Sequence, residues 1–116
     1  MNVKLRQVTP AIGRPHRQIE VTGTPDWDLF DALASELSAA LDGRWSERLD
    51  GLDQRYWDLE CDSGKITLHL EHNLGISIFP ADGADATPAS LAALDRAFYF
   101  LINYNPPSSA IRTDGP

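Results

Sequence analysis

The sequence predicts a small α+β fold in which an antiparallel β-meander of about four to five strands carries two α-helices packed on one face. Two segments begin with a Thr-Pro pair, at Thr24 and at Thr87, and continue with apolar residues at helical spacing. Between them, apolar and polar residues alternate in short runs separated by turn sequences. Alternating runs joined by tight turns are typical of an antiparallel meander.

Length and composition limit the possible classes of protein. The 116 residues fit a single domain, which we place at residues 1–107, followed by a flexible C-terminal tail at 108–116. The net charge of −7 argues against nucleic-acid binding, because phosphate contacts need clustered Lys and Arg. No apolar run is long enough for a membrane span, and the start does not resemble a signal peptide. A single cysteine, Cys61, allows no internal disulfide, so we expect a cytoplasmic protein.

The charge is distributed unevenly along the chain. Residues 1–18 contain four basic residues and no acidic one, whereas the rest of the chain is strongly acidic. The segment is either a first strand paired beside an acidic body or a basic arm that contacts an anionic partner. Strand-like alternation begins near Val3 and resumes at 17–21 after a Pro- and Gly-containing segment. Whether the first strand pairs with the meander stays open.

The first helix has marked ends. Thr24 is expected to be its N-cap, with Pro25 in the first helical position and acidic residues in the first turn. Gly43 is expected to end the helix in a left-handed conformation. The predicted buried stripe consists of Phe30, Leu33, Leu37 and Leu41, with Ala34 and Ala40 beside it.

The meander is predicted between residues 44 and 80. In the run 44–51, Trp45, Glu47 and Leu49 are expected to face alike. The hairpin connection Asp62-Ser63-Gly64 places its glycine where a positive φ is tolerated. The residues expected to face inward are Trp57, Leu59 and Cys61 in one strand and Ile66, Leu68 and Leu70 in the next.

The second helix is predicted to be capped by Thr87, with Pro88 in the first position. Its expected buried stripe is Leu91, Leu94, Phe98, Leu101 and Ile102. Residues 97–102 are apolar nearly all round, so this end is either buried on several sides or in contact with another chain. The candidate interface residues are Tyr99, Phe100 and Tyr104, because interfaces favour aromatic side chains.

One cluster of residues suggests chemistry. His69 and Glu71 share a strand face, and Asp58 or Glu60 is expected across the hairpin, which makes His69 and Glu71 weak candidates for a metal site. His72 points to the opposite face of a regular strand, so the simpler interpretation is a solvated face with polar pairs. No nucleophile, phosphate loop or cysteine pair is recognisable, so we assign no catalytic residue and no cofactor.

A resemblance to known proteins involves two segments, DGLDQRYWDLE at 50–60 and ITLHLEHNLGISIFP at 66–80. They resemble small bacterial proteins of unknown function, and this resemblance implies no activity. The layout of helix, antiparallel strands and helix in an acidic chain is also similar to that of bacterial secretion-effector chaperones and immunity proteins. Such a likeness implies a partner protein.

We therefore expect a small cytoplasmic protein-interaction module, immunity- or chaperone-like, that binds a partner protein through an acidic and aromatic surface. One alternative is a metal- or small-ligand-binding enzyme centred on the face that carries His69 and Glu71. Another is a homodimeric structural protein packed through the second helix. The expected partner is another protein or a second copy of the chain, and neither nucleic acid nor a membrane.

Overall fold

The computed structural model describes residues 1–106, so the tail predicted at 108–116 lies outside the described residues. Its strands are β1 (Lys4–Val8), β2 (His16–Thr22), β3 (Arg44–Asp50), β4 (Gln54–Cys61), β5 (Gly64–Glu71) and β6 (Gly75–Pro80). Its helices are α1 (Trp27–Ala40) and α2 (Pro88–Ile102), with a short 3-10 turn, η1 (Gly83–Asp85), before α2. Within the described residues, neither helix has the length and hydrophobicity that crossing a bilayer requires.

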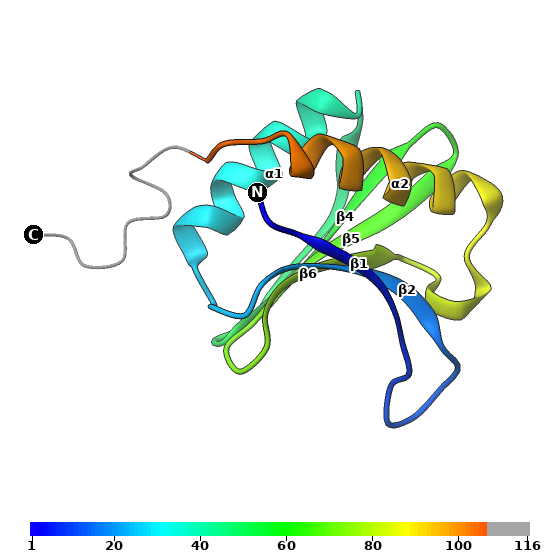
Figure 1. Ribbon diagram of the computed structural model, residues 1–116, viewed down its shortest axis with the longest axis horizontal. Coiled ribbons are helices and arrows are strands. Elements are labelled where there is room, and N and C mark those ends of the chain that lie inside the picture. The colour runs from blue at the N-terminus through cyan, green and yellow to red at the C-terminus, as the bar shows by residue number, and fades with distance from the viewer. Residues whose placement is uncertain (107–116) are drawn as a thin grey trace, which may run out of the picture.

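The described strands form one antiparallel sheet in the order β1-β2-β6-β5-β4-β3. The α+β class is confirmed, whereas the predicted number of four to five strands is wrong, because the sheet has six. The strands β1 and β2 join the meander through pairing of β2 with β6, in which Ile19 lies opposite Ile78. Both helices cover the same side of the sheet, and we call the other side the open face (Figure 1).

The hydrophobic core lies between the helices and the sheet. Strand residues alternate between the two faces, so every second residue of β2, β4, β5 and β6 is available for the core. The predicted inward residues Leu59, Cys61, Ile66, Leu68 and Leu70 are all buried. The largest buried side chains are those of Phe30, Ile19, Leu33, Leu37, Leu59, Ile66, Leu68, Leu70, Ile76, Ile78, Leu94 and Leu101.

Helix α1 begins later than predicted. The Asp26 carboxylate accepts a hydrogen bond from the backbone N–H of Leu29 at 3.0 Å, so Asp26 is the N-cap in place of Thr24. At the other end Asp42, with φ of 51°, takes the left-handed position that was predicted for Gly43. Aspartate tolerates this conformation better than most residues with a Cβ atom. Ala40, which was predicted beside the buried stripe of this helix, is exposed.

Two predictions about the meander are wrong in detail. A register shift between Trp45 and Glu47 places Trp45 opposite Leu59 and Glu47 opposite Asp58. A bulge inserts one extra residue into its strand, so the residues after it point to the face opposite to the one that regular alternation predicts. Trp45 therefore lies on the helix side of the sheet, while Glu47 lies on the open face. In the hairpin after β4, the positive φ angles belong to Asp62 and Ser63, at 49° and 65°, and not to Gly64.

Helix α2 begins as predicted, because the Thr87 hydroxyl accepts a hydrogen bond from the Ser90 N–H at 3.1 Å. Its buried residues are Ser90, Ala93, Leu94, Ala97 and Leu101. The predicted stripe is partly wrong, because Leu91 is only half-buried and Ile102 is 41% exposed. Small side chains face the sheet, which lets the helix backbone pack close to it.

Candidate functional site

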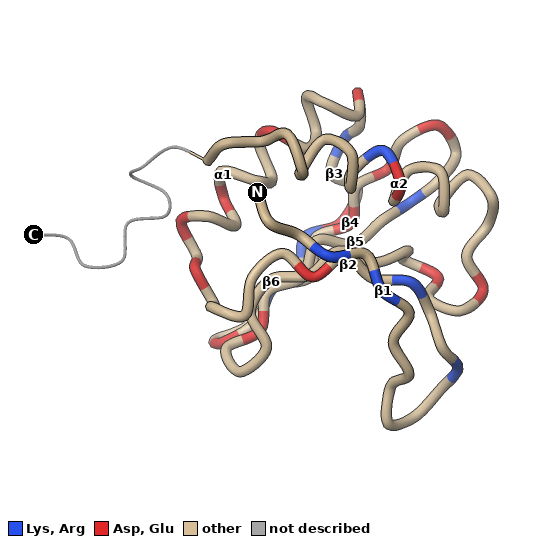
Figure 2. The backbone as a smooth tube through the Cα atoms, in the orientation of Figure 1, with Lys and Arg blue, Asp and Glu red and all other residues tan. Residues whose placement is uncertain are grey.

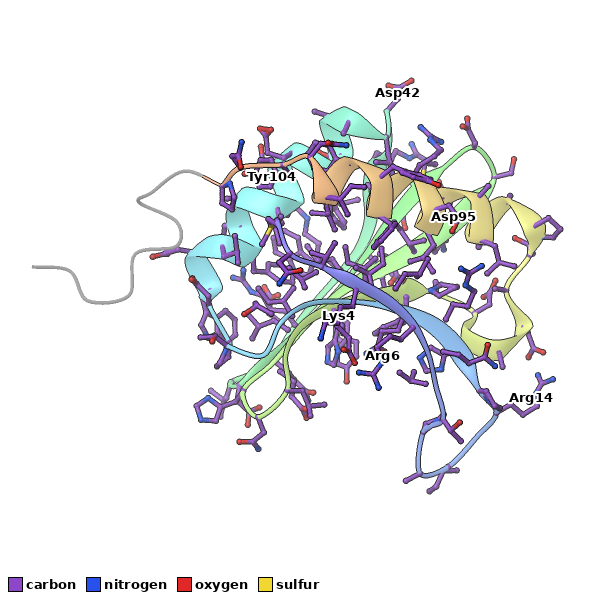
Figure 3. All side chains as sticks on the ribbon, viewed as in Figure 1. Lys4, Arg6, Arg14, Asp42, Asp95 and Tyr104 are labelled. Atoms are coloured by element: carbon purple, nitrogen blue, oxygen red, sulfur yellow. The ribbon has the colours of Figure 1, made fainter. Side chains whose placement is uncertain are left out.

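A row of polar and aromatic side chains crosses the open face. Tyr56 lies opposite His69, His69 opposite Ser77, Ser77 opposite Glu20, and Glu20 opposite Lys4. Residues paired in this way on adjacent antiparallel strands share one face of the sheet. Figure 3 shows Lys4 on the side of the sheet away from α2. The row therefore brings together side chains from β1, β2, β6, β5 and β4.

A cavity of about 840 Å³ lies over this row. Pro10 from the β1–β2 connection and Leu74 from the β5–β6 turn contribute to its walls. Both connections extend beyond the sheet on the side opposite the helices (Figure 1). The volume lies in the range of small-molecule sites. We call this cavity the trough; its lining residues include Lys4, His16, Gln18, Glu20, Thr22, Gly23, Tyr56, His69, Ser77 and Phe79.

His69 is the most unusual residue of the trough. Its side chain is 9% exposed, and its ring stacks on Tyr56 with centroids 4.2 Å apart and meets the ring of Phe79 nearly edge-on at 5.7 Å. Its Nε2 atom is buried and has no hydrogen-bond partner among the described residues. Desolvation lowers the pKa of the imidazole, and Glu71 opposes this shift only in part. His69 is therefore a neutral imidazole at pH 7.

The neutral state of His69 predicts how stability responds to acid. Its folded pKa lies below the ordinary value, so as the pH falls from 7.5 the unfolded chain takes up a proton first. The free energy of unfolding should therefore decrease through pH 6.5 by up to about 1.4 kcal/mol per pH unit, until the folded pKa is reached. Urea unfolding at pH 7.5 and 5.5 measures this loss. Between these two pH values the free energy of unfolding should decrease less in the variant His69→Phe than in the wild type.

The exposed His72 provides the control, because His72→Phe removes an imidazole without touching the trough. We expect this variant to keep the wild-type difference between the two pH values. An equal pH response in wild type and His69→Phe would show that His69 is not the group responsible.

The carboxylates predicted near His69 lie elsewhere. Asp58 is opposite Thr67 and accepts a hydrogen bond from its hydroxyl at 2.6 Å, while Glu60 is opposite Lys65. The expectation that either acid lies across from His69 is wrong, because the β4–β5 register places Tyr56 there. Glu71 follows on the same face of β5. In the part of the chain that the structure describes, no three His, Cys, Asp or Glu side chains are arranged to hold a metal.

The aromatic residues predicted as an interface on α2 differ in exposure. Tyr99 is 66% exposed, whereas Phe100 and Tyr104 are half-buried, stack with centroids 5.3 Å apart and pack against the core. Burial, and to a lesser extent the charge of Glu36, raises the pKa of Tyr104. The exposed large apolar side chains of α2 are therefore those of Tyr99 and Ile102. Contact of α2 with another chain stays a prediction.

A larger exposed apolar surface lies at one end of the open face. Leu49, Leu52 and Leu74 are 68%, 103% and 69% exposed, and Tyr56 is 36% exposed. Leu49 and Tyr56 are cross-strand partners. The other two leucines lie in turns that adjoin, because the N–H of residue 72 donates to the carbonyl of residue 53 at 2.9 Å. We call these four residues the apolar patch; sequence reasoning missed it because two of its members lie in polar turn sequences.

Charge differs between the two halves of the open face. Acidic residues occur on the strands and turns around the apolar patch, and several Lys and Arg lie along β1 and β2 (Figure 2). Arg48 and Arg55 are sequence neighbours of patch residues, but their guanidinium groups lie over the ring of Trp57 on the helix side of the sheet. Glu47, Asp53 and Glu71 form no ion pair with any described residue. The patch is therefore apolar with acidic surroundings.

Two further groups have structural roles. The thiol of Cys61 is buried, and desolvation raises its pKa, so it is not a reactive thiolate. The guanidinium of Arg55 lies 4.9 Å from the ring centre of Trp27 and 5.1 Å from that of Trp57, and it bonds Asp31 at 2.7 Å. This cation–π cluster joins α1 to β4.

The fold and site define a class of small α+β domain with one helix-covered and one open sheet face, the open face bearing a cavity. The chain belongs to the family described as "Protein of unknown function (DUF3630)", whose model matches residues 10–94. The matched range includes β2 to β6 and most of the trough, while Lys4 lies before it. No curated protein and no solved structure matches the chain.

Proposed function

We propose that this domain is a protein-interaction module whose partner docks on the open face of the sheet. Such a role resembles that of immunity proteins and chaperones, which act by holding another protein. The observation that carries the proposal is the exposed apolar patch of Leu49, Leu52, Tyr56 and Leu74. Soluble proteins seldom expose large apolar patches without a binding role, and these four side chains gather at one end of the sheet.

The charge around the patch indicates the chemistry of the partner. Glu47, Asp53 and Glu71 border the patch, and none of them forms an ion pair within residues 1–106. Acidic groups at the rim of an interface attract a basic partner and increase its association rate. The partner segment therefore combines aliphatic or aromatic side chains with Lys or Arg.

Selection from a library of random 12-residue peptides displayed on phage tests this function with the chain as bait. We expect enriched peptides to contain apolar residues next to Lys or Arg. Affinity for a synthetic enriched peptide should fall about tenfold in Leu49→Ser and in Leu52→Ser, because the few side chains at the centre of an interface that dominate binding contribute more than 1 kcal/mol each. Calorimetry measures the affinities.

The matched control is Tyr99→Ser, which removes an equally exposed apolar side chain from α2. We expect it to leave the peptide affinity unchanged. Binding that Tyr99→Ser abolishes and Leu52→Ser does not would move the interaction surface to α2 and overturn the proposal. Failure to enrich any peptide in repeated selections would count against a segment-binding role as well.

A second candidate function is small-ligand binding at the His69 face. The unpartnered Nε2 atom of His69, a residue that lines the cavity, favours it, because an unsatisfied buried polar atom is costly unless something binds it.

A further inference from the structure

We propose that the trough binds a small aromatic carboxylic acid that carries a hydrogen-bonding group on its ring. In this arrangement the ring lies beside His69 and Phe79, the ring substituent bonds Nε2 of His69, and the carboxylate pairs with Lys4. The inference does not depend on the apolar patch binding a protein.

The aromatic end of the site follows from the walls of the trough. His69 lies against Tyr56 on one side and meets Phe79 edge-on, and His16 meets the same Phe79 ring at 5.8 Å. Two imidazoles and two carbocyclic rings thus surround one part of the cavity. Planar ligands pack well against such walls, because offset and edge-to-face contacts between rings are favourable.

The polar contact within this end is the Nε2 atom of His69. The side chain is more than nine-tenths buried, and the atom has no partner among the described residues. A neutral imidazole nitrogen accepts or donates one hydrogen bond, so a hydroxyl group satisfies it in either tautomer. The binding that we propose requires Tyr56, which stacks on His69, to rotate away from Nε2. The hydroxyl of Tyr56 is held by an exposed 3.3 Å hydrogen bond to Gln54, which opposes this rotation only weakly.

The charged end of the site is Lys4. Its cross-strand neighbour Glu20 is already paired with Arg6 at 3.2 Å, and Lys4 itself forms no ion pair with a described residue. The trough therefore has an unbalanced positive charge at this end, which suits a carboxylate.

The separation of the two ends sets the size of the ligand. His69 and Lys4 lie on β5 and β1, three strand spacings apart, which corresponds to about 14 Å between backbones. The long Lys4 side chain spans part of this distance. A single ring with a short acidic side chain spans the remainder and is small compared with the cavity of about 840 Å³.

Three probes test both ends of the site on the unmodified chain. They are 3-(4-hydroxyphenyl)propanoic acid, 3-phenylpropanoic acid, which lacks the ring hydroxyl, and 3-(4-hydroxyphenyl)propan-1-ol, which lacks the carboxylate. Titrations at pH 7.5 followed by amide NMR shifts should give the first probe at least a tenfold lower Kd than each of the others. The largest shifts should occur at residues 69, 77 and 79.

Variants assign each contact to a residue. Lys4→Gln should weaken binding of both acids about tenfold and leave the alcohol unchanged. Lys65→Gln is the matched control, because it removes the same charge from the open face outside the trough. His69→Phe should abolish the preference for the ring hydroxyl while 3-phenylpropanoic acid still binds.

Defined outcomes overturn the inference. They are the absence of saturable binding by all three probes at 10 mM, equal affinity of acid and alcohol for the wild type, and equal effects of Lys4→Gln and Lys65→Gln. The wild-type probe series decides the question even if His69→Phe fails to fold. The apolar patch and the trough share Tyr56 and Leu74, whereas Leu52 lies outside the trough. Peptide binding is therefore tested with Leu52→Ser and probe binding with Lys4→Gln, so that failure of one proposal is distinguished from failure of the other.

Discussion

Replacing Gly75 by alanine is expected to destabilise the protein by about 3 to 5 kcal/mol, a large part of the stability of a domain this size. Gly75 has φ of 89°, a conformation that residues with a Cβ rarely adopt. An added Cβ would overlap the carbonyl oxygen of Thr22 and lie 2.6 Å from the carbonyl carbon of Gly23. Because these are backbone atoms, β6 and the link from β2 to α1 would have to move apart.

The control for Gly75→Ala is Gly83→Ala. Gly83 also has a positive φ, 59°, but an added Cβ would meet no atom within 4 Å. This variant measures backbone strain alone, which amounts to about 1 to 2 kcal/mol. In urea unfolding, Gly75→Ala should therefore lose clearly more stability than Gly83→Ala. Equal losses would show that no close approach exists at Gly75.

Gly64→Ala is expected to lower the free energy of unfolding by about 2 to 4 kcal/mol, and here the cause is close packing alone. Gly64 has no positive φ, but an added Cβ would lie 2.6 Å from the carbonyl atoms of Ala89 and 2.7 Å from the nitrogen of Ser90. The first turn of α2 would have to lift from β5. The hydrogen bond from the N–H of Lys65 to the hydroxyl of Ser90, at 3.0 Å, would then be lost.

Two measurements check this result. Urea unfolding gives the loss of stability, and amide hydrogen exchange at Lys65 should become faster. Gly23→Ala is the control, because Gly23 has no positive φ and an added Cβ would meet no atom within 4 Å. A Gly64→Ala variant as stable as Gly23→Ala would contradict the close packing of α2 on β5.

The variants Gly75→Ala and Gly64→Ala are also expected to differ in their effect on ligand binding in the trough. Thr22 and Gly23 line the trough, so Gly75→Ala should weaken binding of the aromatic acid probe by the folded protein. Gly64 packs against α2 on the opposite side of the sheet, so Gly64→Ala should leave that affinity unchanged. The same probe thus reports whether a distortion reaches the open face.

Features encoded by neighbouring residues could be predicted from the sequence. The Thr87 cap and the buried positions of Leu59, Ile66 and Leu68 are confirmed, because capping and alternation depend on residues a few positions apart. Where two local signals competed, the prediction was wrong. The N-cap of α1 was predicted at Thr24 and lies at Asp26, and both residue types cap helices well, so residue type alone does not select between them.

The candidate site was predicted only in part. His69 was recognised from its residue type, but the neighbours expected for it were carboxylates, and those found are Tyr56 and Phe79. A shift of pairing by one residue changes which side chains meet, and strand pairing is set by the whole sheet. The trough also needs Lys4 and Glu20, which reach it only because β2 pairs with β6.

The sequence by itself determined the α+β class, most of the buried stripe of α1, the N-cap of α2 and the inward faces of β4 and β5, because these depend on local periodicity and on capping. Only the tertiary structure decided that β1 and β2 complete the sheet and that the open face holds a trough with a buried, neutral imidazole. The reason is that the pairing of β2 with β6 joins segments more than 50 residues apart along the chain. The energy of such contacts comes from burial and register across the whole sheet, which no local pattern records.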